Sequence, residues 1–137
     1  MKELTVEASI GNLNDALDFV NGELELHNCS PELRNQIDIA MEEIFMNIAR
    51  YAYKPADGYV RICIFVGEEI VVTFEDTGKP FNPVEQAEPD LNKPVMERKI
   101  GGLGIFLVKQ LMDKVAYTRV DNKNVLTITK EIAGNHL

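Results

Sequence analysis

The sequence has no tryptophan, only two cysteines, and no long uninterrupted hydrophobic run. Two cysteines with no cluster of histidines exclude a zinc site built on Cys and His, and Cys63 lies in an apolar run, which predicts a buried free thiol rather than a disulfide. No segment has the length of a transmembrane helix, and the N-terminus lacks the apolar stretch of a signal peptide. We therefore expect a cytoplasmic protein with no membrane partner.

Basic residues are also scarce. The chain has 14 Lys and Arg against 22 Asp and Glu, a net charge of −8. A nucleic-acid surface needs clustered basic side chains, so this balance argues against nucleic acid as a direct partner. A phosphate ligand is not excluded, because a helix N-terminus and a metal ion can hold phosphate locally.

The chain has 137 residues, 45% of them hydrophobic, which favours one domain over residues 1–137 with a packed core. Periodicity and turn residues predict the order of the elements. The first half has a strand at 4–10, a helix from 12 to about 27, and a second helix from Ser30-Pro31 to before Pro55. The second half has strands at 59–66 and 69–75, a helix opened by Gly101-Gly102, and strands near 115–120 and 125–132 joined by a turn at 121–124. The fold class predicted is α+β, a two-layer sandwich whose mixed, mostly antiparallel sheet is covered on one face by three helices.

The second helix carries Glu43 and Asn47, four residues apart and therefore on one helix face. Mg²⁺ prefers hard oxygen ligands and keeps most of its waters, so one amide oxygen together with phosphates could hold it. A carboxylate one turn away could deprotonate a nucleophile. A solvated helix edge explains the same spacing.

Asp76 and Gly78 follow an apolar strand at the point where the chain turns. A carboxylate there could accept a hydrogen bond from an exocyclic amine such as that of adenine, and Gly78 would allow close backbone approach. An Asx turn at the end of a hairpin is the alternative.

A glycine-rich segment, Gly101-Gly102-Leu103-Gly104, precedes the third helix. Its free amides and the helix dipole would suit a polyphosphate, and Arg98 and Lys99 stand just before it. A flexible hinge with ordinary surface charges is the alternative. The long loop before it is typical of a lid or binding loop.

In this order, the three motifs resemble the Bergerat ATP-binding fold of the GHKL (histidine-kinase-like) ATPases, and specifically the branch of anti-sigma-factor serine/threonine kinases. That branch's Asn-Ala-x-x-His-x-Tyr segment is similar to residues 47–53, its Asp-x-Gly-x-x-Phe-Asp-Pro segment to residues 76–83, and its glycine-rich helix start to residues 101–113. Tyr51 departs from the pattern by replacing the common histidine.

The resemblance implies ATP and Mg²⁺ as cofactors and a role for each motif residue. Asn47 would ligate the metal, and Glu43 would be the general base. Asp76 would read adenine in a pocket shaped by Gly78, and Thr127 or Thr129 would support that contact. The phosphates would be bound at the glycine-rich segment, by Gly101, Gly102, Leu103 and Gly104, under an ATP lid at about 79–100.

The function implied is an anti-sigma-type kinase that phosphorylates a STAS-type anti-anti-sigma protein, sequesters a sigma factor in a partner-switching circuit, and forms a homodimer. One alternative is an ATP-dependent partner-binding module without physiological kinase activity, which Tyr51 and the acidic residues of the lid keep open. A detached histidine-kinase catalytic domain is less favoured, because neither His27 nor His136 has the sequence context of a phosphoacceptor helix.

Overall fold

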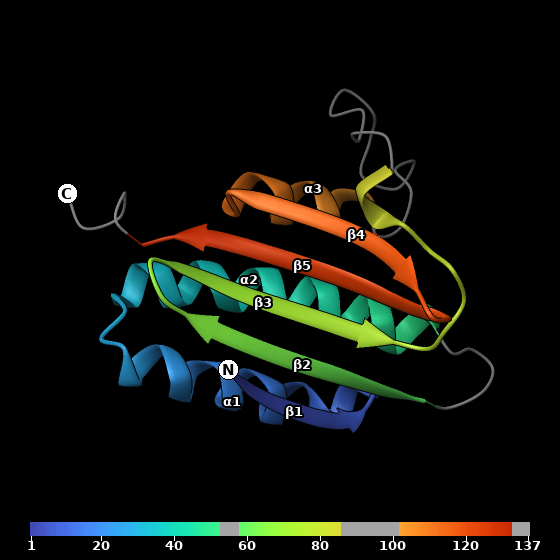
Figure 1. The fold of residues 1–137 in the computed structure, drawn as a ribbon, viewed down its shortest axis with the longest axis horizontal. Helices are drawn as coiled ribbons and strands as arrows, with labels where there is room; N and C mark the ends of the chain where they lie inside the picture. Colours follow the sequence, from blue (N-terminus) through green and yellow to red (C-terminus); the bar gives the residue numbers. More distant parts are fainter. Residues whose placement is uncertain (53–57, 86–101, 133–137) are drawn as a thin grey trace.

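The described part of the chain forms three helices and five strands (Figure 1). It is a computed structural model that describes residues 1–52, 58–85 and 102–132. The helices are α1 (Leu13–Leu26), α2 (Pro31–Asn47) and α3 (Gly102–Leu111), with short helical turns at Ile10–Asn12, Ile48–Ala52 and Pro83–Glu85. The strands are β1 (Lys2–Glu7), β2 (Tyr59–Val66), β3 (Glu69–Asp76), β4 (Lys114–Val120) and β5 (Lys123–Glu131).

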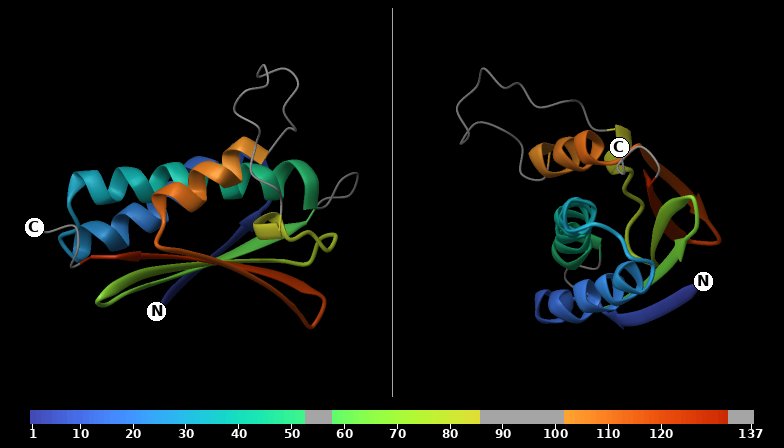
Figure 2. Two further views of the ribbon diagram at one scale, coloured as in Figure 1. Left: turned by 90° about the horizontal axis from the view of Figure 1, so that it is seen from above. Right: turned by 90° about the vertical axis from the view of Figure 1, so that its left-hand side faces the viewer.

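The strands form one sheet in the order β1-β2-β3-β5-β4. All four pairings in the described sheet are antiparallel. The helices lie together on one face of the sheet (Figure 2). The predicted two-layer α+β fold with three helices on one face is therefore confirmed, and the sheet is antiparallel throughout its described part rather than mixed.

The alternation of side chains along β3 determines on which face of the sheet Asp76 lies. Ile70, Val72 and Phe74 are fully buried against the helices. Successive side chains of a strand point to opposite faces, so Asp76 continues this series onto the helix-covered face. A carboxylate is therefore held at the edge of the core, at the end of a central strand.

Helix α2 begins as its sequence predicts. The hydroxyl oxygen of Ser30 accepts a hydrogen bond from the Leu33 amide at 3.1 Å, and Pro31 occupies the first turn. The α-helical hydrogen bonding ends at Asn47, and a π-helical turn follows it directly over Ile48–Ala52. Such turns often mark functional sites. The predicted end of this helix, just before Pro55, falls outside the described residues.

The turn between β4 and β5 is shorter than predicted. It consists of Asp121 and Asn122, both in the left-handed region with φ of 51° and 63°. Two such residues form a compact hairpin turn, so β5 already begins at Lys123. Asn124, which we predicted to lie in the turn, is instead a buried strand residue paired with Asp76.

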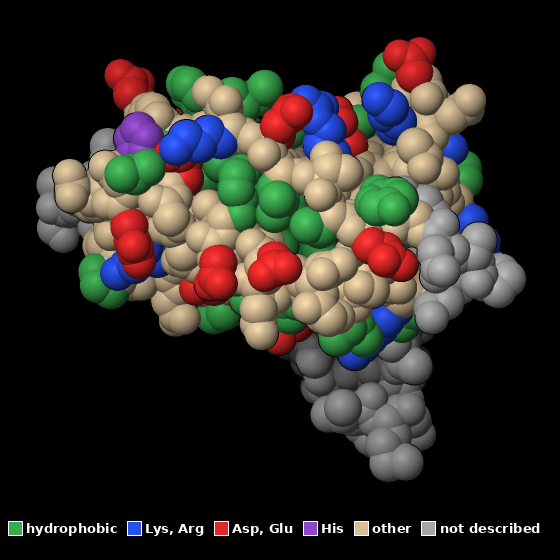
Figure 3. Space-filling model, turned by 90° about the horizontal axis from the view of Figure 1, so that it is seen from below, with side chains coloured by type: hydrophobic (Ala, Val, Ile, Leu, Met, Phe, Trp, Pro, Cys, Tyr) green, Lys and Arg blue, Asp and Glu red, His purple; other side chains and the backbone are tan. Residues whose placement is uncertain are grey.

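Neither of the two cysteines forms a disulfide. Cys29 and Cys63 are both buried and free, as predicted for Cys63, and burial raises the pKa of both thiols. None of the helices in the described part of the chain is long and apolar enough to cross a membrane. Figure 3 shows the side that carries α1 and β1, where acidic side chains are scattered among apolar ones.

Candidate functional site

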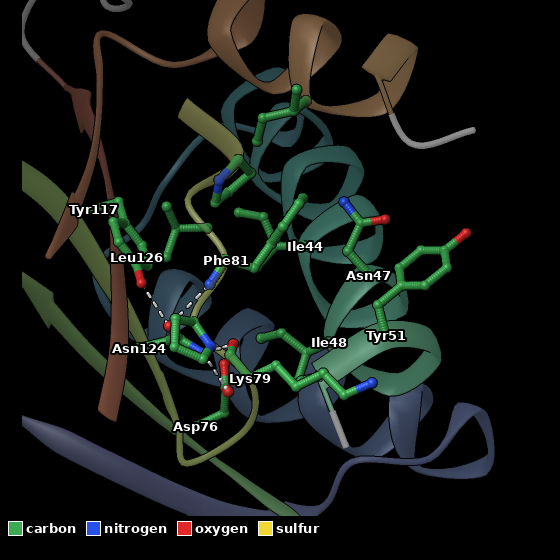
Figure 4. Close-up of a pocket in the computed structure, with 14 residues that line it drawn as sticks. Ile44, Asn47, Ile48, Tyr51, Asp76, Lys79, Phe81, Tyr117, Asn124 and Leu126 are labelled. Atoms are coloured by element: carbon green, nitrogen blue, oxygen red, sulfur yellow. Dashed lines mark hydrogen bonds between the residues drawn. The ribbon is translucent and has the colours of Figure 1, made fainter. Parts of the chain in front are cut away.

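A cavity of about 190 Å³ opens between α2 and the end of β3 (Figure 4). Its wall comes from α2 and the π-helical turn, from the segment after β3, and from α3, β4 and β5. The lining residues are Ile44, Asn47, Ile48, Tyr51, Ala52, Asp76, Lys79, Pro80, Phe81, Pro83, Ile105, Tyr117, Asn124 and Leu126. A mostly apolar wall with a few polar groups suits a flat, partly polar ligand.

Asp76 is the carboxylate in this wall, and it is only 6% exposed. Its Oδ1 accepts hydrogen bonds from the Gly78 amide and from Asn124 Nδ2, both at 2.9 Å. No other described residue donates to this side chain, and a carboxylate can accept several hydrogen bonds. Oδ2 therefore keeps its capacity to accept one from a ligand.

Gly78 lies against the end of the π-helical turn. A methyl group at this position would overlap the carbonyl group and the Cβ of Ala52. The next residue, Lys79, donates its amide to the Ala52 carbonyl at 2.9 Å. Packing against the backbone of Ala52 therefore requires glycine at position 78, and the loop after Asp76 is hydrogen-bonded to the π-helical turn.

Glu43 and Asn47 occupy successive turns of α2. Asn47 lines the cavity and points toward it from the last turn (Figure 4). Glu43 lies one turn earlier, outside the cavity wall. Its carboxylate touches Gly104, where a methyl group would overlap it. The structure therefore places the predicted base against the first turn of α3, while the predicted metal ligand lines the cavity one helical turn later.

The glycine-rich segment is described in part. Helix α3 begins at Gly102, so Gly102, Leu103 and Gly104 form its first turn. The first amides of a helix have no partner within the helix and favour anions. Gly101, Arg98, Lys99 and most of the predicted lid at about 79–100 lie outside the described residues.

Thr127 and Thr129 are not brought to the cavity, which corrects the prediction that one of them supports the Asp76 contact. Leu126 and Ile128 face the helices, so the two threonines between and after them face the opposite side of the sheet. The Thr127 hydroxyl lies 3.4 Å from that of Thr73, on that outer face. The apolar alternation at 126 and 128 could have revealed this from the sequence.

Asn124 is the residue that sequence reasoning missed. It lies beside Asp76 in the register of β3 and β5 and hydrogen-bonds to it directly. The signal available in the sequence was Asp121-Asn122, a pair of residues that both tolerate positive φ and thus predict a two-residue turn. A predicted two-residue turn at Asp121-Asn122 would have placed Asn124 in the strand that follows it.

No group of three or more His, Cys, Asp or Glu side chains in residues 1–52, 58–85 and 102–132 could hold a metal ion by itself. Asn47 offers one hard amide oxygen at the cavity. Such a donor fits Mg²⁺, which takes most of its ligands from water and phosphate.

Comparison with known proteins agrees with this arrangement. Residues 6–130 match the family model of the histidine kinase-like ATPase domain. The chain is 26% identical to the serine/threonine-protein kinase BtrW of Bordetella bronchiseptica over 133 residues, which covers 96% of this chain and 92% of that protein. It is 37% identical to the serine-protein kinase RsbW of Halalkalibacterium halodurans over 101 residues, 69% of this chain and 60% of that one.

Solved structures show the same fold. A structure of the RsbU and RsbW domains of a Mycobacterium tuberculosis protein matches 96% of this chain with a TM-score of 0.64 and 12% identity, over 33% of that longer chain. A blue-light activated histidine kinase of Erythrobacter litoralis matches 79% of this chain with a TM-score of 0.57 and 19% identity, again over 33% of its length.

The family match spans nearly the whole chain, and the fold agrees with it. The resemblance inferred from the three motifs is thereby confirmed, with serine-protein kinases among the sequence relatives. This chain belongs to the histidine kinase-like ATPase family.

Proposed function

We propose that this chain is a protein serine/threonine kinase of the anti-sigma type, which binds ATP with Mg²⁺ in the cavity beside Asp76. The observation that carries the proposal is the position of Asp76, a buried carboxylate in an apolar cavity whose wall also holds Asn47. The names of the relatives BtrW and RsbW support kinase activity.

The base-binding end of the cavity is formed by Asp76 and its apolar neighbours. Oδ2 of Asp76 would accept a hydrogen bond from the exocyclic amine of adenine. Guanine presents a carbonyl at the equivalent position, which cannot donate to a carboxylate. Ile48 and Leu126 would contact the faces and edges of the base. This arrangement favours adenine over guanine nucleotides.

The phosphate end is formed by α2 and the first turn of α3. The amides of Gly102, Leu103 and Gly104, with that of Gly101 before them, would bind phosphate oxygens at the helix N-terminus. The amide oxygen of Asn47 would be the protein ligand of Mg²⁺, and the metal supplies neutralisation of phosphate charge when bound.

Glu43 would act as the general base. Its carboxylate would accept the proton of a serine hydroxyl while the serine oxygen bonds to the γ-phosphorus and the bond to the departing ADP breaks. Base catalysis of this kind contributes about 10²–10⁴-fold. The contact with Gly104 holds the carboxylate at the start of α3, next to the proposed phosphate site.

The proposed phosphate acceptor is a STAS-type anti-anti-sigma protein, and a sigma factor is the proposed second partner, in a cytoplasmic circuit. A homodimer is the expected form of the kinase. These assignments rest on the resemblance to the RsbW and BtrW kinases. The chain spans about three fifths of the length of that RsbW relative.

The test measures binding and transfer separately. MgATP binding is measured by calorimetry for the wild type, Asp76→Asn and Glu43→Gln, and transfer is measured with labelled ATP and a purified STAS-type protein. Asp76→Asn should weaken binding by about tenfold or more, because an acceptor that carries charge is lost. Glu43→Gln should bind normally and transfer at least about 100-fold more slowly.

Two outcomes decide between the candidate functions. Absence of MgATP binding by the wild type would refute the proposal. Tight MgATP binding with no transfer to the STAS-type protein, together with nucleotide-dependent capture of that protein, would instead support a partner-binding module without kinase activity.

A further inference from the structure

Both ends of the Asn124 side-chain amide form hydrogen bonds within the protein. Its Nδ2 donates to Asp76 Oδ1 at 2.9 Å and to the Lys79 carbonyl at 2.8 Å. Its Oδ1 accepts from the Tyr117 hydroxyl at 2.6 Å, from Arg119 at 3.0 Å and from the Phe81 amide at 3.5 Å. The side chain is only 6% exposed, so both ends of the amide are committed within the protein.

The chemistry of these neighbours determines which way the amide points. Arg119 can only donate, so it requires the oxygen of Asn124 on its side. The Asp76 carboxylate and the Lys79 carbonyl can only accept, so they require the nitrogen on theirs. The reversed amide would set donor against donor and acceptor against acceptor. The orientation is therefore imposed by partners on both sides.

The same residues tie the segment after β3 to the β4–β5 hairpin. Arg119 donates to the Gly78 carbonyl at 2.9 Å, while Asn124 contacts the backbone of Lys79 and Phe81. This segment forms one wall of the cavity (Figure 4). The position of the wall is thus set by two residues that flank the two-residue turn of the hairpin.

We propose that Asn124 is the positioning residue of the cavity: its amide occupies Oδ1 of Asp76, leaves Oδ2 for the adenine base, and anchors the wall at residues 78–81. The inference deepens the proposed function and rests on it. Asn124 acts through Asp76 and the wall rather than by touching the reacting atoms. Adenine affinity should therefore depend on the donor that position 124 presents to Asp76.

The variant Asn124→Asp tests this directly, because it replaces the donor by an acceptor of the same shape. The introduced carboxyl would face Asp76 and the Lys79 carbonyl on one side and Arg119 and the Tyr117 hydroxyl on the other. Two carboxylates in contact repel each other, and one of them holds a proton as the pH falls. A protonated carboxyl donates again to Asp76, as the amide does.

The measurement is the dissociation constant of ADP, by calorimetry between pH 5.5 and pH 8, relative to the matched control Asn122→Asp. That control adds the same charge at the exposed turn of the same hairpin. Asn124→Asp should bind ADP about tenfold or more weakly than the control at pH 8, since a hydrogen bond to a charged group has been lost. The deficit should shrink to about threefold or less at pH 5.5, because the introduced carboxyl regains its proton.

Tyr117→Phe is a milder second variant, which keeps the aromatic wall and removes one donor to Asn124 Oδ1. It should weaken ADP binding about two- to fivefold with no dependence on pH, and it carries the test if Asn124→Asp does not fold. An Asn124→Asp affinity equal to the control at every pH, or a deficit that does not change with pH, would overturn the inference while leaving the proposed function intact. If Asn124→Asp does not fold, unchanged ADP affinity in Tyr117→Phe would overturn the inference. A wild type that does not bind ADP would refute both.

Discussion

The carboxylate of Glu43 lies directly against the α-carbon of Gly104, so that even a methyl group on the glycine would overlap it. The two residues belong to different helices, and this contact is where the first turn of α3 meets α2. A carboxylate is favoured at a helix N-terminus by the helix dipole. The contact therefore places the proposed base beside the amides proposed to hold phosphate.

Gly104→Ala should impair transfer without unfolding the protein. The added methyl group meets the end of a flexible side chain, so Glu43 can swing away at small cost in stability. We expect a midpoint of thermal unfolding within a few degrees of the wild type, unchanged or mildly weakened MgATP affinity, and phosphoryl transfer reduced about tenfold or more because the base has moved.

The matched control is Gly22→Ala in α1, an exposed helical glycine whose added methyl group meets nothing within 4 Å. It should stabilise the protein by about 0.5–1 kcal/mol, since alanine is the better helix former. Unimpaired transfer by Gly104→Ala would show that the position of Glu43 does not matter for the reaction.

Gly78→Ala should affect stability and binding together. Here the added methyl group meets the backbone carbonyl of Ala52, which cannot move without disturbing the π-helical turn. We expect a loss of about 1–3 kcal/mol of unfolding free energy in urea. The rise in melting temperature that excess MgATP produces should also shrink. Gly11→Ala, which meets nothing within 4 Å, is the control, and equal behaviour of the two variants would contradict the packing argument.

Asp38→Asn should change how stability depends on pH. Burial raises the pKa of the Asp38 carboxyl, against smaller opposing effects of the Asn21 amide and Arg34, and Glu42 adds to the rise. A raised pKa in the folded state favours folding at low pH, and this contribution is lost as the pH rises through the folded-state pKa. The variant can still accept the Asn21 hydrogen bond, at 2.6 Å in the wild type, through its amide oxygen.

The stability of Asp38→Asn relative to the wild type should therefore increase from pH 4 to pH 7, as measured by urea unfolding. The control is Asp18→Asn, at an exposed position of α1, which removes the same charge. It separates the effect of burial at Asp38 from the effect of net charge. A relative stability that falls with rising pH would reverse the sign and refute the assignment to burial.

Ser30→Ala should destabilise the protein without changing the site. The Ser30 hydroxyl caps α2 at the end opposite Asn47. Loss of such a cap costs about 1 kcal/mol, which urea unfolding resolves, while MgATP affinity should stay unchanged. Ser30→Thr keeps the hydroxyl and should restore most of the loss; failure to do so would mean that the cap is not the cause.

Local interactions were predictable from the sequence. The start of α2 depends on Ser30 and Pro31, which act within one helical turn, and strand β2 was predicted with the bounds that the structure has. The hairpin turn at Gly67-Glu68 likewise depends on adjacent residues. The motif residues Glu43, Asn47 and Asp76 were identified because their spacing and order along the chain resemble those of a known family.

The error at the β4–β5 turn shows the limit of that reasoning. Extending the turn by two residues removed Asn124 from the strand and from consideration. Thr127 and Thr129 were candidates because the family resemblance implied that one of them supports the adenine contact. In a strand, side chains alternate between faces, so a residue's role depends on the face on which it lies. The structure places the threonines on the face opposite the cavity.

The sequence alone determined the order of the elements, the cap of α2 and the family, because these depend on neighbouring residues or on the order of short motifs. Only the tertiary structure decided which side chain meets Asp76. Asn124 is 48 residues away from Asp76 along the chain, and antiparallel pairing of β3 with β5 brings the two together. Such a contact depends on the register between two strands that are not consecutive in the sequence, so no hairpin turn sets it.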